Sequence, residues 1–168
     1  YTVLNEEESF LQEVNIPFNG KSSNGFREAL AFKESQGRYH VVNTYGYLGK
    51  YQFGKSTLKR FKIYNAQEFL NTPEMQEDAF VALCSVNKWI LRKDIKRSVG
   101  KKIRGIQITE SGILAAAHLA GAGNVKKYLR SHGKLSFKDG YGSSVHHYIK
   151  LFSGFDTSFI EANRKPIL

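Results

Sequence analysis

The chain contains 168 residues, of which 41% are hydrophobic and 24% are charged. This length is typical of a single domain that buries a core without a metal or disulfide, and the composition excludes disordered and collagen-like chains. The 25 lysines and arginines exceed the 15 acidic residues and give a net charge of +10, which favours a polyanionic or acidic partner such as nucleic acid, anionic lipid or a bacterial wall polymer.

Three further observations narrow the class of protein. The single cysteine, Cys84, excludes an internal disulfide framework and a zinc site built from several cysteines, and we expect it to be a structural thiol. No run of about 18 apolar residues occurs, so no membrane span is expected. Because the sequence starts at Tyr1 rather than Met, we expect a processed protein or a domain excised from a longer one.

Two helices are predicted in the first 36 residues. Asn5 and the three glutamates after it form a helix start, and Pro17 follows the end of that segment. Ser23 or Asn24 can cap a second helix that extends to about Gln36, in which apolar residues recur at helical spacing.

Residues 37–53 show a different pattern. They contain three glycines, five tyrosines or phenylalanines and the β-branched pair Val41–Val42. This composition predicts a loop with a short, irregular β-hairpin. Short helices are predicted after it, at residues 56–61 and 66–70.

The strongest helix start in the chain is the segment 71–74 (Asn-Thr-Pro-Glu), which combines a cap residue, a proline in the first turn and an early carboxylate. The apolar stripe from Met75 to Ile90 then predicts an amphipathic helix of at least four turns. The segment Lys88–Arg104 carries eight basic residues and one acid, Asp94. It is interpreted either as a solvated helix face and loop or as a surface that attracts a polyanion.

The last third of the chain is predicted to be helical as well. Residues 109–120 are mostly small and apolar, as in a helix that is buried on all sides, and Gly121 ends this segment. Asn124 can start a helix that extends to about Arg130, and Ser143 or Ser144 can cap the last one. The expected fold is therefore mainly α, with about seven helices, a short β-hairpin and a buried central helix, in one domain over residues 1–168.

Glu34 is the most informative carboxylate of the sequence. Leu30 and Phe26 precede it by four and eight residues, so that all three lie along one stripe and Glu34 points toward the apolar side of its helix. Partial burial disfavours the ionised form and raises the pKa of a carboxyl group, which is how a glutamate becomes a general acid near neutral pH. The alternative is a half-exposed, inert glutamate at a helix end.

The segment after Glu34 favours a carbohydrate ligand. No acidic residue occurs between Glu34 and Glu68, and the intervening loop supplies aromatic and amide side chains instead. The faces of sugar rings stack on aromatic groups and their hydroxyls bind amides, although some of these tyrosines can equally be core residues of the hairpin. A single acid facing such a loop therefore predicts a neutral glycan as substrate.

At this point the sequence resembles a known family. Glu34-Ser35, a seven-residue spacer and the segment 43–52 (Asn-Thr-Tyr-Gly-Tyr-Leu-Gly-Lys-Tyr-Gln) resemble, without a gap, the catalytic segment of soluble-type lytic transglycosylases (SLT domains). These belong to the lysozyme-like superfamily, which also includes the goose-type lysozymes. The family pattern has Ser where this chain has Asn43, and Leu-Met where it has Lys50-Tyr51.

Two later stretches resemble the same family in order. Residues 116–125 resemble its Ala-Ala-Tyr-Asn-Ala-Gly-x-Gly-x-Val motif, with His118 and Leu119 in place of Tyr and Asn. Tyr148-Ile149 resembles the Tyr-Val of its Glu-Thr-Arg-x-Tyr-Val motif. The resemblance covers residues 26–152 and implies a lysozyme-like α+β fold.

The resemblance also implies a function. It implies cleavage of the β-1,4 bond between N-acetylmuramic acid and N-acetylglucosamine in peptidoglycan, with 1,6-anhydro-muramic acid ends as product and no metal or cofactor. Glu34 falls on the catalytic acid, which later acts as base. The residues implied to bind substrate, position the glutamate or line the cleft are Gln52, Tyr148, Tyr51, Tyr45, His118, Ser35 and Asn43, with Arg38 and His40 as further contacts.

The implied partners are peptidoglycan glycan strands, with flanking domains or an inhibitor protein as further partners and no nucleic acid. The implied location is the periplasm, the cell wall or the medium.

Three other interpretations remain open. One is a hydrolysing muramidase on the same fold, for which Glu110 or Asp139 would have to reach the site. Another is a basic nucleic-acid-binding module, which would use the positive charge and the aromatic residues but leaves the segment around Glu34 unexplained. The third is a wall-binding domain without catalysis. The segment 139–142 (Asp-Gly-Tyr-Gly) lacks the paired acids of a calcium loop and is expected to be a turn.

Overall fold

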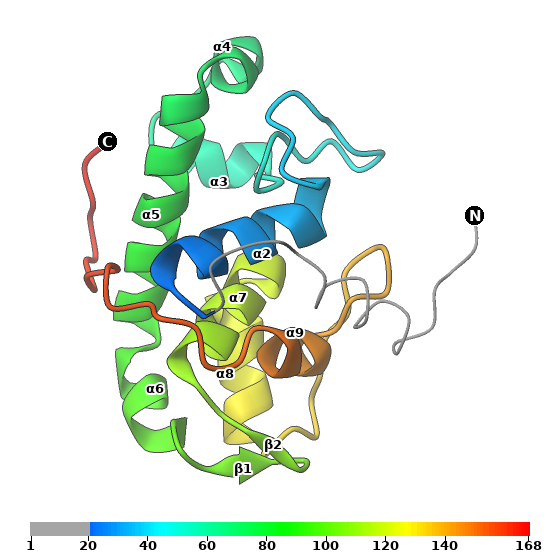
Figure 1. Ribbon diagram of the computed structural model, residues 1–168, viewed down its shortest axis with the longest axis vertical. Coiled ribbons are helices and arrows are strands. Elements are labelled where there is room, and N and C mark those ends of the chain that lie inside the picture. The colour runs from blue at the N-terminus through cyan, green and yellow to red at the C-terminus, as the bar shows by residue number, and fades with distance from the viewer. Residues whose placement is uncertain (1–20) are drawn as a thin grey trace.

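The computed structural model describes residues 21–168 and is mainly helical within them (Figure 1). Eight helices and one antiparallel two-stranded sheet are present in this range. The elements are α2 (Ser23–Ser35), α3 (Lys55–Arg60), α4 (Ala66–Asn71), α5 (Pro73–Ile90), α6 (Arg92–Ser98), β1 (Lys102–Ile103), β2 (Ile106–Gln107), α7 (Glu110–Ala120), α8 (Ala122–Arg130) and α9 (Val145–Leu151). The prediction of a mainly α fold is confirmed, whereas the helix predicted from Asn5 lies outside the described residues.

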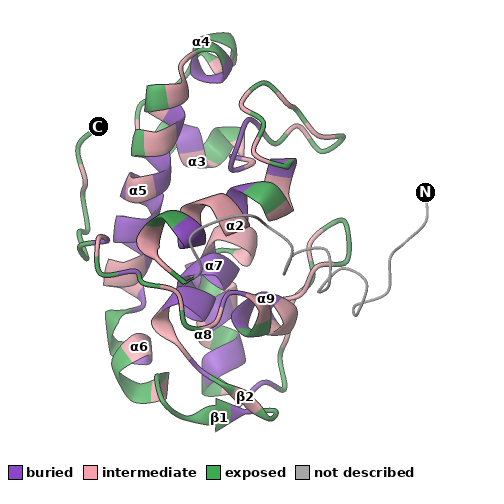
Figure 2. Ribbon diagram, viewed as in Figure 1, coloured by how far each residue is buried: buried purple, intermediate pink, exposed green. Residues whose placement is uncertain are grey.

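Helix α7 is the buried central helix that its composition predicts (Figure 2). Residues 111–117 are all buried, and α7 packs against α5, α8 and α9. At Gly112 the backbone of α9 comes so close that a Cβ atom would lie 2.5 Å from the carbonyl oxygen of Ile149. The absence of a side chain at this position therefore permits the close approach of α7 and α9.

The observed helix caps agree only in part with those predicted from the sequence. Ser144 caps α9 as one of the two predicted residues, but α2 is capped by Ser22, whose hydroxyl accepts a hydrogen bond from Gly25 N, rather than by Ser23 or Asn24. Helix α8 begins at Ala122 rather than Asn124, because the Asn124 side chain donates back to the carbonyl of Ala120 instead of capping. These corrections move each helix start by one or two residues.

The segment between α2 and α3 forms the predicted irregular hairpin. Its pairing consists of isolated antiparallel bridges, Val42 with Leu48 and Leu48 with Phe53, rather than of continuous strands. The β1–β2 hairpin was not predicted. Its first strand lies at the end of the basic segment Lys88–Arg104 and its second strand follows that segment, and strands of two residues are too short to show an alternating pattern.

The hairpin is attached to α5 through the buried side chain of Gln76. Its Oε1 accepts a hydrogen bond from Lys50 N at 2.8 Å, and its Nε2 donates to the carbonyls of Tyr39, Phe69 and Leu70 at 3.0–3.4 Å. One side-chain amide thus forms hydrogen bonds with main-chain groups of the hairpin and of α4 at the same time. Next to it, Gly49 has a φ of +78° and no room for a Cβ, which would overlap the Gln76 amide.

A comparison of two glycines tests this attachment. Gly46 has a similar φ of +83° but nothing within 4 Å of a Cβ, so G46A should cost only the strain of the left-handed conformation, about 1–2 kcal/mol. In G49A the added Cβ would also displace the Gln76 amide, so that buried main-chain groups lose their hydrogen-bond partners. G49A should therefore lower the free energy of unfolding by at least about 1 kcal/mol more than G46A. Urea unfolding of both variants measures the difference, and equal losses would show that Gln76 is not essential.

Candidate active site

A cleft of about 1090 Å³ lies between two stretches of the chain that are distant in sequence, residues 33–52 and 118–148. The C-terminal end of α2 and the hairpin form one wall, and the end of α7 and the loop before α9 form the other. The side chains that line it include Lys33, Glu34, Ser35, Arg38, Asn43, Tyr45, Tyr47, Gln52, His118, Asn124, Lys138, Asp139, Tyr141 and Tyr148.

Glu34 lies in this cleft with its side chain half-buried, on the same helix stripe as the fully buried Phe26 and Leu30. The Tyr148 hydroxyl donates a hydrogen bond to Glu34 Oε1 at 2.9 Å. Burial raises the pKa of Glu34 to about 7, the hydrogen bond from Tyr148 opposes that shift, and the carboxylate of Asp139 adds to it. The expectation that Glu34 faces the apolar side of its helix is thus confirmed, and near neutral pH its carboxyl group can both give and take a proton.

Four more of the predicted residues line the cleft with Glu34: Tyr148, Gln52, Tyr45 and His118. Gln52 has a φ of +55° and its side-chain amide donates to the carbonyl of Gly49, so strained backbone holds it at the cleft. His118 donates from Nε2 to the carbonyl of Tyr51 at 2.6 Å, while its Nδ1 is buried without a hydrogen-bond partner. Burial lowers the pKa of His118, so its neutral form is favoured.

Ser35 and Asn43 also line the cleft, but their side chains bind the main chain of the hairpin. The Ser35 hydroxyl donates to the carbonyl of Lys50 at 2.6 Å. Asn43 Oδ1 accepts hydrogen bonds from the main-chain nitrogens of Tyr45 and Tyr47, both at 2.9 Å. Both residues therefore shape the wall of the cleft.

Tyr51 does not line the cleft, contrary to the expectation from the sequence. Its ring is fully buried and stacks on Phe80 at 4.0 Å between ring centroids, and its hydroxyl donates to Glu77 Oε2 at 2.6 Å. The reason is the alternation of the hairpin, which turns Tyr51 toward α5. His40 is exposed and is not among the residues of the cleft, whereas Arg38 is.

The loop before α9 supplies cleft residues outside the predicted substrate-binding set, although Asp139 had been named as a carboxylate that hydrolysis would require at the site. Tyr141 and Asp139 are the most prominent, and both belong to the segment 139–142 that was expected to be a turn. It is a turn, in which Asp139 Oδ1 accepts hydrogen bonds from Tyr141 N and Ser143 N. No local pattern could have placed this turn opposite Glu34, because its position depends on the packing of α9 against α7.

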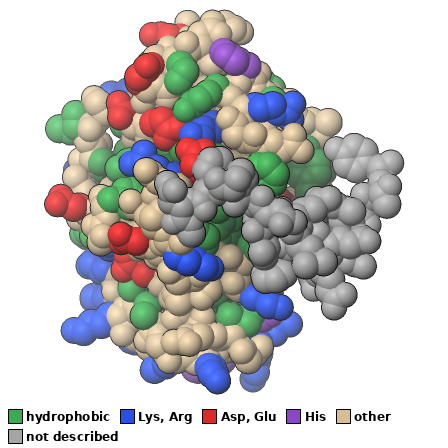
Figure 3. Space-filling model, in the orientation of Figure 1, with side chains coloured by type: hydrophobic (Ala, Val, Ile, Leu, Met, Phe, Trp, Pro, Cys, Tyr) green, Lys and Arg blue, Asp and Glu red, His purple; other side chains and the backbone are tan. Residues whose placement is uncertain are grey.

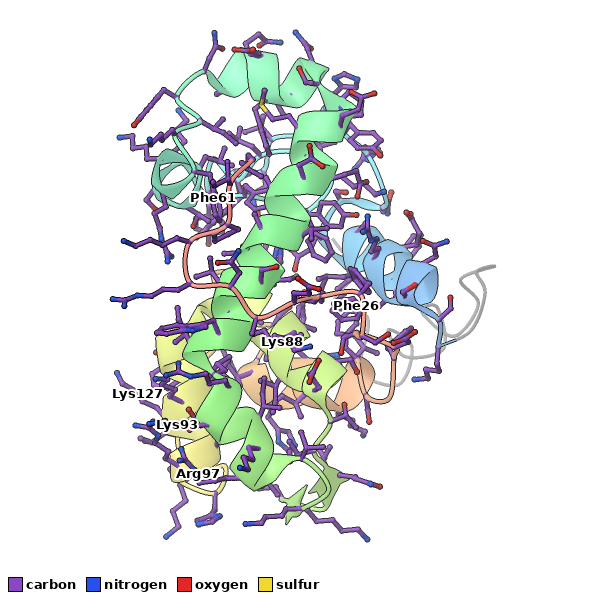
Figure 4. All side chains as sticks on the ribbon, turned by 90° about the vertical axis from the view of Figure 1, so that its left-hand side faces the viewer. Phe26, Phe61, Lys88, Lys93, Arg97 and Lys127 are labelled. Atoms are coloured by element: carbon purple, nitrogen blue, oxygen red, sulfur yellow. The ribbon has the colours of Figure 1, made fainter. Side chains whose placement is uncertain are left out.

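Most of the basic segment lies at the end of the molecule formed by α6, the β1–β2 hairpin and α8, where lysine and arginine side chains gather (Figure 1, Figure 3), and none of its residues lines the cleft. Figure 4 shows Lys93, Arg97 and Lys127 projecting from this end. Its one acid, Asp94, is buried and pairs with Arg97 at 3.0 Å and Arg130 at 3.1 Å. The basic residues of Lys88–Arg104 are exposed or partly exposed on the end of α5, on α6 and on or beside β1. Binding of a polyanion to this surface stays a prediction.

Comparisons with protein-family models, with curated proteins and with solved structures gave no match. Among residues 21–168, no three His, Cys, Asp or Glu side chains gather in an arrangement that could hold a metal ion. None of the helices in the same range is long and apolar enough to cross a membrane. Cys84 is buried, and burial raises the pKa of its thiol to about 12.

The raised pKa of Glu34 predicts how stability depends on pH. Because the folded state holds a proton on Glu34 up to about pH 7 and the unfolded state only to about 4.5, the free energy of unfolding falls as pH rises between these values. E34Q removes this loss and should be more stable than the wild type above pH 7, by up to about 3 kcal/mol, and equal to it below pH 4.5.

Denaturant unfolding from pH 4 to 8 measures this difference. The matched control is E161Q, which alters an exposed carboxylate and should follow the wild type at every pH. A constant difference between E34Q and the wild type over the whole range would contradict the raised pKa.

Proposed function

We propose that this protein cleaves the β-1,4 bond between N-acetylmuramic acid and N-acetylglucosamine in peptidoglycan, as a lytic transglycosylase with a lysozyme-like fold. The observation that carries the proposal is Glu34, a carboxyl group with a pKa near 7 in a long cleft lined by aromatic and amide side chains. Glycosidic bond cleavage needs a carboxyl group that is still protonated at working pH.

In the proposed reaction Glu34 acts twice. It first donates its proton to the oxygen that leaves C1 of the muramic acid residue. The ionised Glu34 then accepts the proton of the C6 hydroxyl of the same sugar, whose oxygen bonds to C1 and closes a 1,6-anhydro ring. A pKa near neutrality suits both steps, because proton transfer in either direction is then inexpensive.

Other cleft residues suit the sugar rings of a glycan. The exposed rings of Tyr45, Tyr47 and Tyr141 offer faces for sugar stacking, and the amide side chains of Gln52 and Asn124 offer hydrogen bonds to hydroxyl and acetamido groups. The basic end described above suits an anionic wall polymer, which would be met in the periplasm, in the cell wall or outside the cell.

A second candidate function is hydrolysis of the same bond. It is favoured by Asp139, which supplies the cleft with the second carboxylate that glycoside hydrolases commonly use. In this reaction water, rather than the C6 hydroxyl, would attack C1.

The proposal predicts that E34Q abolishes cleavage while the fold is retained. Glutamine keeps the shape of the side chain but cannot donate the proton to the leaving oxygen, so release of muropeptides from purified sacculi should fall at least about 10²–10⁴-fold. E161Q is the control and should retain wild-type turnover. Normal turnover in E34Q would reject Glu34 as the acid.

A further prediction concerns Tyr148, whose hydrogen bond stabilises the ionised form of Glu34. Y148F removes this bond, so the pKa of Glu34 should rise further. The alkaline limb of the pH–rate profile should then move to higher pH, whereas a purely structural role for Tyr148 would lower the rate without moving the limb.

A further inference from the structure

We propose that Asp139 acts as a general base that admits water to the reaction, so that the protein releases reducing muramic acid ends beside 1,6-anhydro ends. This inference rests on the proposed function, and it assigns a role to a residue that neither the motif around Glu34 nor its neighbours on the hairpin include.

Asp139 and Glu34 belong to different walls of one cleft. Glu34 is at the end of α2, and Asp139 is in the loop that precedes α9, the helix whose Tyr148 donates to Glu34. The carboxylate of Asp139 acts electrostatically on Glu34 and contributes to holding its proton. A charge interaction of this kind weakens with distance, so it agrees with the presence of both carboxyl groups in one cleft.

The hydrogen bonds of Asp139 hold its carboxylate in place and leave one oxygen available. Oδ1 accepts from Tyr141 N at 2.9 Å and from Ser143 N at 2.8 Å, and the main-chain nitrogen of Asp139 donates to the carbonyl of Ser143. Within residues 21–168, Asp139 Oδ2 accepts no hydrogen bond. One oxygen thus anchors the carboxylate while the other can bind a water molecule in the cleft.

The loop that carries Asp139 is also tied to the opposite wall. The Tyr45 hydroxyl donates to the carbonyl of Gly140 at 3.1 Å, and the Thr44 and Tyr141 hydroxyls are 2.7 Å apart. The rings of Tyr45 and Tyr141 meet edge to face at 5.0 Å between centroids, and a Cβ at Gly140 would overlap the Tyr45 ring. These contacts fix Asp139 relative to the wall that bears Glu34.

The charged groups around the two carboxyls are basic. Lys33 adjoins Glu34 on α2, Arg38 lies on the hairpin, and Lys138 adjoins Asp139 on the loop; all three line the cleft. They favour a substrate with carboxylates, such as the lactyl group and peptide stem of muramic acid, and Asp139 is the carboxylate that lines the cleft with Glu34.

Glu34 and Asp139 together account for every proton transfer in the hydrolytic step. As the oxygen of water bonds to C1, its proton passes to Asp139 Oδ2. The bond between C1 and the leaving oxygen breaks, the electron pair stays on that oxygen, and the proton of Glu34 joins it. Asp139 ends protonated and Glu34 ionised, and exchange with solvent restores both. The C6 route described above needs Glu34 alone.

The test is the product ratio of D139N on purified sacculi, measured by mass spectrometry, since the hydrolysed end is one water heavier than the anhydro end. Asparagine keeps the Oδ1 acceptor and hence the turn, but it cannot accept the proton of water. We expect reducing ends to fall about 10²-fold or more while anhydro ends persist. D156N is the matched control, because Asp156 Oδ1 also accepts a main-chain hydrogen bond, from Ser158 N, outside the cleft.

The outcomes separate this inference from the proposed function. An unchanged ratio in D139N, loss of both products with a normal melting curve, or a wild type that forms no reducing ends would each overturn the role of Asp139. Failure of the proposed function would look different: the wild type would release no muropeptides, or E34Q would release as many as the wild type.

Discussion

The ion cluster around the buried Lys50 ammonium group holds together the parts of the molecule that form the cleft. Lys50 Nζ lies 2.9 Å from Glu28 Oε1 on α2 and 2.7 Å from Glu77 Oε1 on α5, so that one side chain of the hairpin joins two helices. Burial alone would lower the pKa of Lys50, but hydrogen bonds to the two carboxylates outweigh it and raise the pKa. Removal of both carboxylates would leave a buried charge uncompensated, and breaking a buried ion pair in this way typically costs about 3–5 kcal/mol.

This cluster also explains two unusual residues of the hairpin. Lys50 and Tyr51 are a cation and a phenol at neighbouring buried positions, and both contact the carboxylate of Glu77. Tyr39 completes the group by donating to the same carboxylate at 3.0 Å. Since the Ser35 hydroxyl binds the Lys50 carbonyl, the cluster fixes the end of α2 directly beside Glu34.

The cleft itself is electrostatically costly, as expected of a functional site. Glu34 is held in surroundings that disfavour its charge, and His118 has a buried ring nitrogen without a partner. The raised pKa of Glu34 lowers stability near and above neutral pH, and the lowered pKa of His118 lowers it at acidic pH. The well-satisfied network around Lys50 offsets these losses. The packing of α9 on α7 brings Tyr148 to the carboxyl group of Glu34 and places the loop before α9 in the same cleft.

The sequence by itself determined the helices and the direction of Glu34, because caps, prolines and apolar spacing act within a few residues of each other. Helix α5 after Pro73, the buried α7 and the stripe Phe26–Leu30–Glu34 followed from such local patterns. Only the tertiary structure decided that Tyr51 packs into the core and that Asp139 lines the same cleft as Glu34. Those positions depend on the hairpin packing against α5 and on α9 packing against α7, which join segments far apart in the chain and leave no periodic signal within either segment.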